Sequence, residues 1–259
     1  MQIVFIGAGR LATNLAPALL ASGHQIVQVF SRTGASAQAL AFRVNAEPVT
    51  DLAAVSEHAD VYIFSVSDAA LPVLLAKFKA VSEDAVFLHT AGSMPMSVFQ
   101  NVARHYGVLY PMQTFSKDRQ VDFARIPFFI EGSDRRALEV SRTLASSVSK
   151  HVQDLSTEAR RHLHLAAVFA CNFVNHCYQL SAEVLDKYHL PFDIMLPLID
   201  ETAEKVHSLS PIEAQTGPAI RYDENVMQAQ LQLLADAPRL AEIYALMSKS
   251  IHQSYIDHS

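Results

Sequence analysis

The feature that most constrains the fold is a short glycine-containing segment near the N-terminus. It follows an apolar run at residues 2–6 and leads into a helical pattern at residues 10–22. The segment reads Gly7-Ala8-Gly9-Arg10-Leu11-Ala12. The first glycine allows a tight turn, the second lets a pyrophosphate approach the backbone, and the small sixth residue permits close helix-to-strand packing. The pattern predicts a dinucleotide-binding turn, and the alternative is a tight turn that binds nothing.

Apolar runs and helical patterns alternate up to residue 155. We expect strands near residues 2–6, 25–30, 61–66, 85–89, 107–110, 127–131 and 151–155, and helices near 10–22, 36–43, 68–80 and 134–149. This alternation is typical of a doubly wound, Rossmann-type α/β sheet. Beyond it only helical patterns follow, near residues 157–187, 191–208, 224–236 and 238–256. The sequence predicts a dinucleotide-binding Rossmann-type domain at residues 1–155 and an all-α domain at residues 156–259.

Composition argues against several classes of protein. Of the 259 residues 50% are hydrophobic, and the net charge is −6, which disfavours disorder and partners such as nucleic acid or anionic lipid. The uncharged stretches at residues 11–31 and 163–182 are interrupted by polar residues that a membrane span would not tolerate. Cys171 and Cys177 would lie about 9 Å apart on one helix, beyond disulfide reach. With no basic residues ahead of the first apolar run, we expect a cytoplasmic protein.

The end of the second predicted strand bears on the identity of the cofactor. NAD-binding domains usually place Asp or Glu about 20 residues after the glycines, but no acidic residue precedes Glu47. The strand instead ends in Ser31-Arg32-Thr33. A guanidinium flanked by hydroxyls can bond a 2′-phosphate, which a carboxylate would repel. We therefore predict NADP(H), and the alternative for residues 31–33 is a solvated loop.

Further cofactor contacts are expected where the next strands end, because ligands of such sheets bind at the carboxyl edge. The predicted cofactor-binding residues are Gly7, Gly9, Arg10, Leu11, Ala12, Ser31, Arg32, Thr33, Ser65, Val66, Ser67, Thr90, Ala91 and Gly92. The alternatives are a helix N-cap at Ser67 and Asp68 and an ordinary turn at residues 90–93. The following loop, residues 110–115, is a candidate border of the substrate.

The long helix predicted at residues 157–187 carries a polar stripe. At 100° per residue one narrow arc holds His164, Val168, Asn172, Asn175 and Gln179. His164 can donate a proton near neutral pH, and Asn172 can orient a carbonyl or imine. We take His164, Asn172 and Ser93 as catalytic candidates; the alternative is a polar face in solvent or at a helix-packing seam. The sequence shows no metal-ligand spacing. Arg221 and Asp223 remain either functional or structural.

Together these segments resemble a family of NADP-dependent oxidoreductases in which a Rossmann-like domain precedes a helical domain of unassigned function. The resemblance spans almost the whole chain and rests on residues 7–12, 31–33, 89–93, 110–115, 164–172 and 216–218. More distantly the chain is similar to pyrroline-5-carboxylate reductase, 6-phosphogluconate and 3-hydroxyacid dehydrogenases, and ketopantoate reductase. The resemblance implies that the helical domain closes the substrate cleft. We expect a homodimer through the C-terminal helices, which are rich in Leu, Met and Ala.

One residue departs from the hydroxyacid dehydrogenase pattern. Those enzymes place a catalytic lysine four residues before an asparagine, and if Asn172 matches that asparagine, the lysine position holds Val168. This departure argues against that mechanism and leaves His164 as the substitute. The sequence thus predicts an NADPH-dependent reductase of a small carbonyl or imine. The alternatives are a ketopantoate-type ketoacid reductase, a deazaflavin-linked NADP oxidoreductase, and a non-catalytic NADP-binding or sensing protein.

Overall fold

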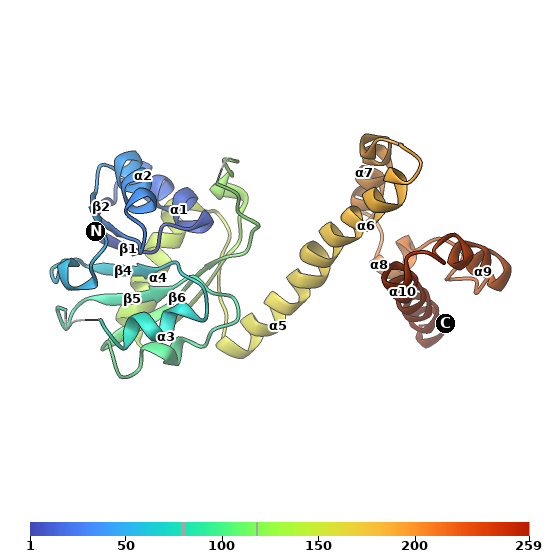
Figure 1. Ribbon diagram of the computed structural model, residues 1–259. Helices are drawn as coiled ribbons and strands as arrows, with labels where there is room; N and C mark the ends of the chain where they lie inside the picture. The colour runs from blue at the N-terminus through green and yellow to red at the C-terminus, as the bar shows by residue number, and fades with distance from the viewer. Residues whose placement is uncertain (79–80, 118, 259) are drawn as a thin grey trace. The chain divides into compact units, whose positions relative to one another are not determined.

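The computed structural model describes residues 1–78, 81–117 and 119–258, and the chain forms two compact units. Unit 1, Met1–Phe169, is an α/β domain, and unit 2, Ala170–Ser259, is helical. The predicted fold class, a Rossmann-type sheet followed by helices, is confirmed (Figure 1). Unit 1 extends beyond residue 155 and includes α5 (Thr157–Ala167), which the sequence pattern had assigned to the second domain.

Unit 1 is built on an eight-stranded sheet with the order β3-β2-β1-β4-β5-β6-β7-β8. The strands are β1 (Gln2–Ile6), β2 (Gln25–Phe30), β3 (Glu47–Val49), β4 (Val61–Phe64), β5 (Val86–His89), β6 (His105–Pro111), β7 (Phe128–Gly132) and β8 (Val152–Asp154). Neighbouring strands run parallel except β6 and β7, which are antiparallel. Strand order reverses between β1 and β4, and such a switch point is where ligands of open α/β sheets bind.

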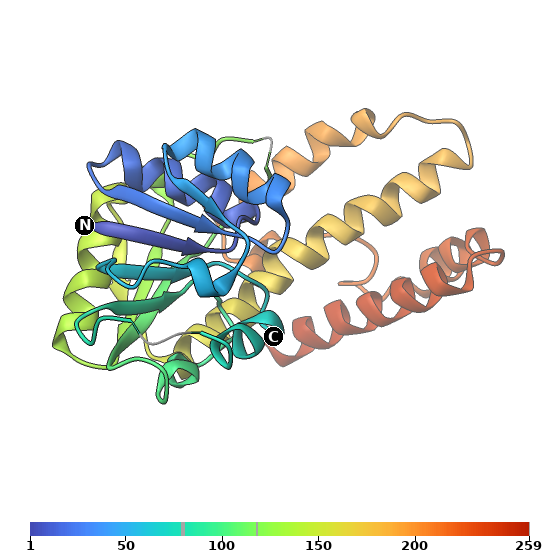
Figure 2. The same ribbon diagram turned by 60° about the vertical axis from the view of Figure 1, so that its left-hand side comes forward.

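Helices cover both faces of this sheet (Figures 1 and 2). Alternate residues of β1 enter different cores: Ile3 and Phe5 pack in one cluster, and Val4 and Ile6 in the other. The first cluster lies under α1 (Arg10–Ala21), α2 (Gly34–Val44) and α4 (Arg135–Val148), and the second includes α3 (Ala70–Leu75). Burial on both faces explains why the strands read as continuous apolar runs.

Unit 2 consists of helices joined by short loops. Its elements are α6 (Val174–Asp186), a 3₁₀ turn (Phe192–Met195), α7 (Leu196–Lys205), α8 (Pro211–Ala214), α9 (Glu224–Leu233) and α10 (Pro238–Asp257). Asp223 caps α9 by accepting the Val226 N–H at 3.3 Å, which gives this residue a structural role. Among the described residues, no helix is long and apolar enough to span a membrane.

The structure differs from the predicted elements at several points. The prediction missed β3, because this edge strand has only three residues and contains Pro48, which an edge tolerates. The helix expected at residues 68–80 is shorter, since α3 spans Ala70–Leu75, and residues 79–80 lie outside the described part of the chain. The continuous α-helix predicted at residues 157–187 was wrong. A π-helical segment, Val168–Phe173, separates α5 from α6, and its i→i+5 hydrogen bonding breaks the 100° spacing used for the polar stripe.

Candidate active site

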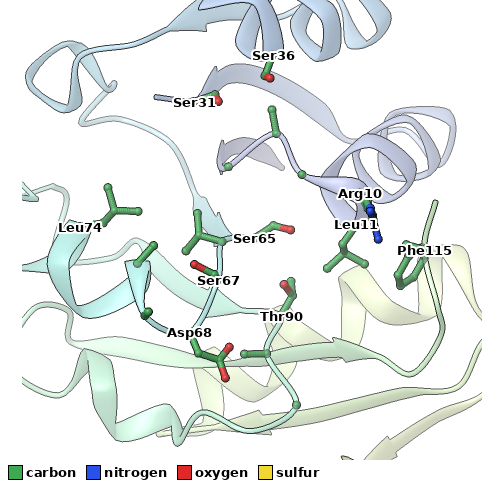
Figure 3. Close-up of a pocket in the computed structure, with 18 of the residues that line it drawn as sticks. Arg10, Leu11, Ser31, Ser36, Ser65, Ser67, Asp68, Leu74, Thr90 and Phe115 are labelled. Atoms are coloured by element: carbon green, nitrogen blue, oxygen red, sulfur yellow. The ribbon is translucent and has the colours of Figure 1, made fainter. Parts of the chain in front are cut away.

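A cavity of about 1040 Å³ opens at the carboxyl ends of the central strands of unit 1 (Figure 3). Its volume is near the upper end of the roughly 300–1,000 Å³ that ligand pockets occupy. The sequence-predicted residues that line it are Gly7, Gly9, Arg10, Leu11, Ser31, Arg32, Thr33, Ser65, Val66, Ser67, Thr90, Ala91, Gly92, Ser93 and His164. Ala12 instead lies on the buried face of α1 and is fully buried. Asn172 belongs to unit 2.

The glycine turn between β1 and α1 forms one wall of the cavity. Gly7 has a positive φ of 113°, and a Cβ at this position would lie 2.2 Å from the Ser65 carbonyl oxygen. The Gly7 N–H donates to the Phe30 carbonyl at 2.8 Å. Only glycine fits here, because the turn crosses directly over the end of β4.

The N-terminus of α1 opens into the same cavity. Gly9 is its N-cap residue, no described side chain caps it, and its first turn contains no acidic residue. The first N–H groups of a helix have no partner within the helix, and this end carries the positive pole of the helix dipole. A Cβ at Gly9 would have no atom nearer than the Ser65 carbonyl oxygen at 3.9 Å, so a ligand can approach the Gly9 backbone closely. These features fit a pyrophosphate.

A second anion-binding arrangement follows β2. Ser31, Arg32 and Thr33 line the cavity where α2 begins, and Thr33 is the N-cap of α2 without a side-chain cap bond. Ser36, in the first turn of α2, lines the cavity as well. Ser36 was not among the predicted cofactor-binding residues, although its position three residues after Thr33 indicates the first turn of a helix that begins there. A guanidinium, three hydroxyls and an uncapped helix end fit a 2′-phosphate.

The opposite end of the cavity lies at the ends of β4 and β5. Figure 3 shows Ser31 and Ser36 at one end of the cavity and Asp68 and Thr90 at the other. Among the described residues, Asp68 is the one acidic side chain that lines the cavity, and it accepts a hydrogen bond from the Ser93 hydroxyl. Neither Ser67 nor Asp68 caps α3 through its side chain, because Ala69 is the N-cap residue there.

Tyr110, Gly92 and His164 meet at this end of the cavity. The Tyr110 hydroxyl, at the end of β6, lies 3.1 Å from Nδ1 of His164 on α5. A Cβ at Gly92 would lie 2.4 Å from the same Nδ1, so the imidazole fits here only against a glycine. Burial raises the pKa of Tyr110, whereas the positive charge of Arg160 opposes this rise. The result is a protonated phenol in contact with an imidazole.

A buried arginine fixes the loop beneath this pair. Arg160, one turn before His164 on α5, is fully buried and donates from Nη1 to the carbonyls of Ala91 and Gly92 at 2.8 and 2.9 Å. Its Nη2 donates to Glu131 at 3.2 Å, and Glu131 also accepts the N–H and hydroxyl of Thr157 at 2.7 Å each. Burial lowers the pKa of Arg160, and Glu131 counteracts this shift. Neither Arg160 nor Glu131 was predicted from the sequence. The position of Glu131, directly after three apolar residues of a strand, does indicate a partly buried carboxylate that needs a partner.

His89 lies under the same loop at the end of β5. It is fully buried, and its Nδ1 accepts the Ala91 N–H at 3.2 Å. Burial lowers the pKa of His89 to about 3, and the charge of Arg160 adds to the shift. His89 is therefore neutral at physiological pH, and it supports the loop without supplying a charge.

Comparisons with known proteins agree with this geometry. A family model described as "NADP oxidoreductase coenzyme F420-dependent" matches residues 2–91, and a model described as a domain of unknown function, DUF2520, matches residues 126–251. The crystal structure of a candidate NADP oxidoreductase from Bacteroides fragilis is 56% identical, with a TM-score of 0.94, and covers 97% of this chain and 98% of that one. No curated protein matches the chain.

Two more distant structures show the fold. An imine reductase from Myxococcus stipitatus in complex with NADP⁺ is 15% identical, with a TM-score of 0.69, and covers 99% of this chain and 93% of that one. A reductive aminase from Aspergillus terreus in complex with NADPH4, cyclohexanone and allyl amine is 16% identical, with a TM-score of 0.71, and covers 99% of this chain and 94% of that one.

Proposed function

Because this chain belongs to the NADP oxidoreductases that combine an F420-dependent-type NADP oxidoreductase domain with a DUF2520 domain, we propose that it reduces a small imine or carbonyl compound with NADPH. One observation carries the proposal. A single cavity joins two uncapped helix N-termini at one end to the Tyr110–His164 pair at the other. The first end suits the phosphates of a dinucleotide, and the second suits proton transfer.

The cofactor is NADP(H), and the cavity offers a place for each of its parts. We propose that the turn at Gly7 and Gly9 with the start of α1 holds the pyrophosphate. Arg32, with the hydroxyls beside it, binds the 2′-phosphate. Small residues at the ends of β4 and β5 border the nicotinamide half, namely Ser65, Val66, Ser67, Thr90, Ala91 and Gly92. NADPH, when bound, supplies the hydride that reduces the substrate carbon.

The chain's own residues supply the proton and orient the substrate. We propose that His164 takes part in proton supply, because its imidazole borders the cavity and contacts the Tyr110 hydroxyl at 3.1 Å. Ser93, which lines the cavity, holds the polarised oxygen or nitrogen, and Asn172 stays a candidate for orienting the substrate. The imine reductase and reductive aminase that share the fold support an imine or a ketone with an amine as the substrate class.

NADPH consumption with a panel of acceptors tests this function. The panel contains cyclic imines, ketones with and without an amine, 2-ketoacids and a deazaflavin. We expect turnover with imines or with ketone and amine together. Turnover only with 2-ketoacids or only with the deazaflavin would refute imines and ketones as the substrate class. Tight NADPH binding without any turnover would indicate a sensing protein.

We further propose that two chains pair through the helices of unit 2. Among its described residues only Ala219 and Ser248 are buried, whereas Leu198, Leu233 and Leu246 are 62, 71 and 69% exposed. So much exposed leucine in a small unit is typical of an interface. Light scattering should give the mass of a dimer at micromolar concentration, and a monomer would refute the pairing. Cys171 and Cys177 are both free, which supports a cytoplasmic location.

A further inference from the structure

The position of Tyr110 assigns it a part in catalysis that the sequence pattern did not reveal. Its hydroxyl is within hydrogen-bond distance of His164 Nδ1, and both residues line the cavity. The two rings meet edge to face, with centroids 6.0 Å apart and planes inclined by 74°. Tyr110 is only 8% exposed, so packing fixes its ring and leaves its hydroxyl directed at the imidazole.

The Nδ1 side of His164 is closed to a substrate by its neighbours. The Gly92 backbone is so near that a Cβ there would lie 2.4 Å from Nδ1 and 2.6 Å from Cγ. Tyr110 Oη occupies the remaining hydrogen-bonding position of Nδ1. A proton on Nδ1 can therefore leave the imidazole in one direction, toward the Tyr110 oxygen.

We infer that Tyr110 is the residue that hands the proton to the substrate, and that His164 Nδ1 replaces it. This inference rests on the proposed reductase function. The Tyr110 O–H bond breaks, and an N–H or O–H bond forms at the imine nitrogen or carbonyl oxygen, while the neighbouring carbon accepts the hydride of NADPH. The Tyr110 oxygen then takes the Nδ1 proton of protonated His164, and the neutral imidazole takes up a proton from hydronium in the solvent, which leaves water, so that one proton from solution is consumed in each turnover.

The electrostatic surroundings suit this exchange. Burial keeps the phenol of Tyr110 protonated at neutral pH, so the donor is loaded when the substrate arrives. Arg160 lies close enough for its positive charge to favour the phenolate that forms briefly during the transfer. Glu131, which accepts a hydrogen bond from Arg160 Nη2, moderates that charge.

Tyr110→Phe tests the inference, because it removes the hydroxyl and keeps the ring. With the imine or ketone-and-amine pair that the wild type reduces, we expect kcat to fall about 10²- to 10⁴-fold, the usual contribution of a general acid. The Kd for NADPH should stay unchanged. A Tyr110→Phe, His164→Ala double variant should be no slower than Tyr110→Phe alone, because the two groups act in series.

Tyr62→Phe is the matched control. Tyr62 is also a buried tyrosine, and its hydroxyl donates to the Ser56 carbonyl at 2.5 Å, outside the cavity. This variant loses a comparable buried hydrogen bond and should keep the wild-type kcat. If Tyr110→Phe retains kcat within a few-fold while His164→Ala is slow, His164 donates directly and the inference is wrong. A wild type that reduces no acceptor would refute the proposed function itself, and the transfer from Tyr110 with it.

Discussion

Replacing Gly92 with alanine should reduce both stability and turnover, because His164 occupies the space that the new methyl group needs. The alanine Cβ would lie 2.4, 2.6 and 3.0 Å from Nδ1, Cγ and Cβ of His164, whereas ordinary contact begins near 3.4 Å. The Cβ contact cannot be relieved by rotating the imidazole, so the backbone of α5 or of the loop must move. Overpacking of this kind costs about 1–3 kcal/mol. For a chain of this size that lowers Tm by roughly 2–12 °C.

The same displacement should slow the reaction. A misplacement of about 1 Å at a reacting group can lower the rate about 100-fold, and we expect kcat of Gly92→Ala to fall by about this factor. Chemical denaturation measures the energetic coupling between residues 92 and 164. It compares the wild type, the two single variants, and the Gly92→Ala, His164→Ala double variant. His164→Ala removes the two closest atoms, so Gly92→Ala should cost less in that background by about 0.5–3 kcal/mol. An equal loss of stability in both backgrounds would refute the contact.

Three further predictions concern the cofactor, the buried histidine and unit 2. Arg32→Ala removes about 1.5–3 kcal/mol of charge-assisted hydrogen bonding. Calorimetry should therefore show NADPH binding weakened roughly 10- to 150-fold and NADH binding unchanged. An equal loss of affinity for both cofactors would mean that Arg32 acts through folding. In the unfolded chain His89 binds a proton below its ordinary pKa of 6.5, whereas in the folded protein its pKa is lowered to about 3. The free energy of unfolding should therefore fall as the pH drops from about 6.5 to about 3, by up to about 1.4 kcal/mol per pH unit. Urea titrations should show that His89→Asn loses this part of the slope, and an identical pH dependence would contradict it. Asn172→Ala should lower kcat about 10²- to 10³-fold, the usual effect of losing one polarising hydrogen bond, at unchanged NADPH affinity. Full activity per folded molecule would make Asn172 structural.

Local patterns explain why the sequence predicted the fold and the cofactor end of the site. The turn at Gly7 and Gly9 is encoded within six residues, and it borders the cavity where the strand order reverses. The strands were visible because burial on both faces leaves continuous apolar runs. β3 was not, since three residues with a central proline make no such run.

The catalytic end depends on contacts between residues far apart in the chain. Tyr110 meets His164 across 54 positions, and Glu131 meets Arg160 across 29. No spacing rule connects such pairs, and an arginine near the start of a helix usually indicates a solvated face rather than a buried charge. The π-helical segment was also hidden, because its apolar residues suit an α-helix equally well.

Transfer of deuterium from C4-deuterated NADPH tests the central claim most directly. The protein is incubated with each C4 isotopomer and the imine or carbonyl acceptors, and the products are analysed by mass spectrometry and NMR. We predict that one isotopomer places deuterium on the former imine or carbonyl carbon of the product, and that the other does not. NADPH that binds tightly but leaves no deuterium in any product would contradict the assignment of this chain as a reductase.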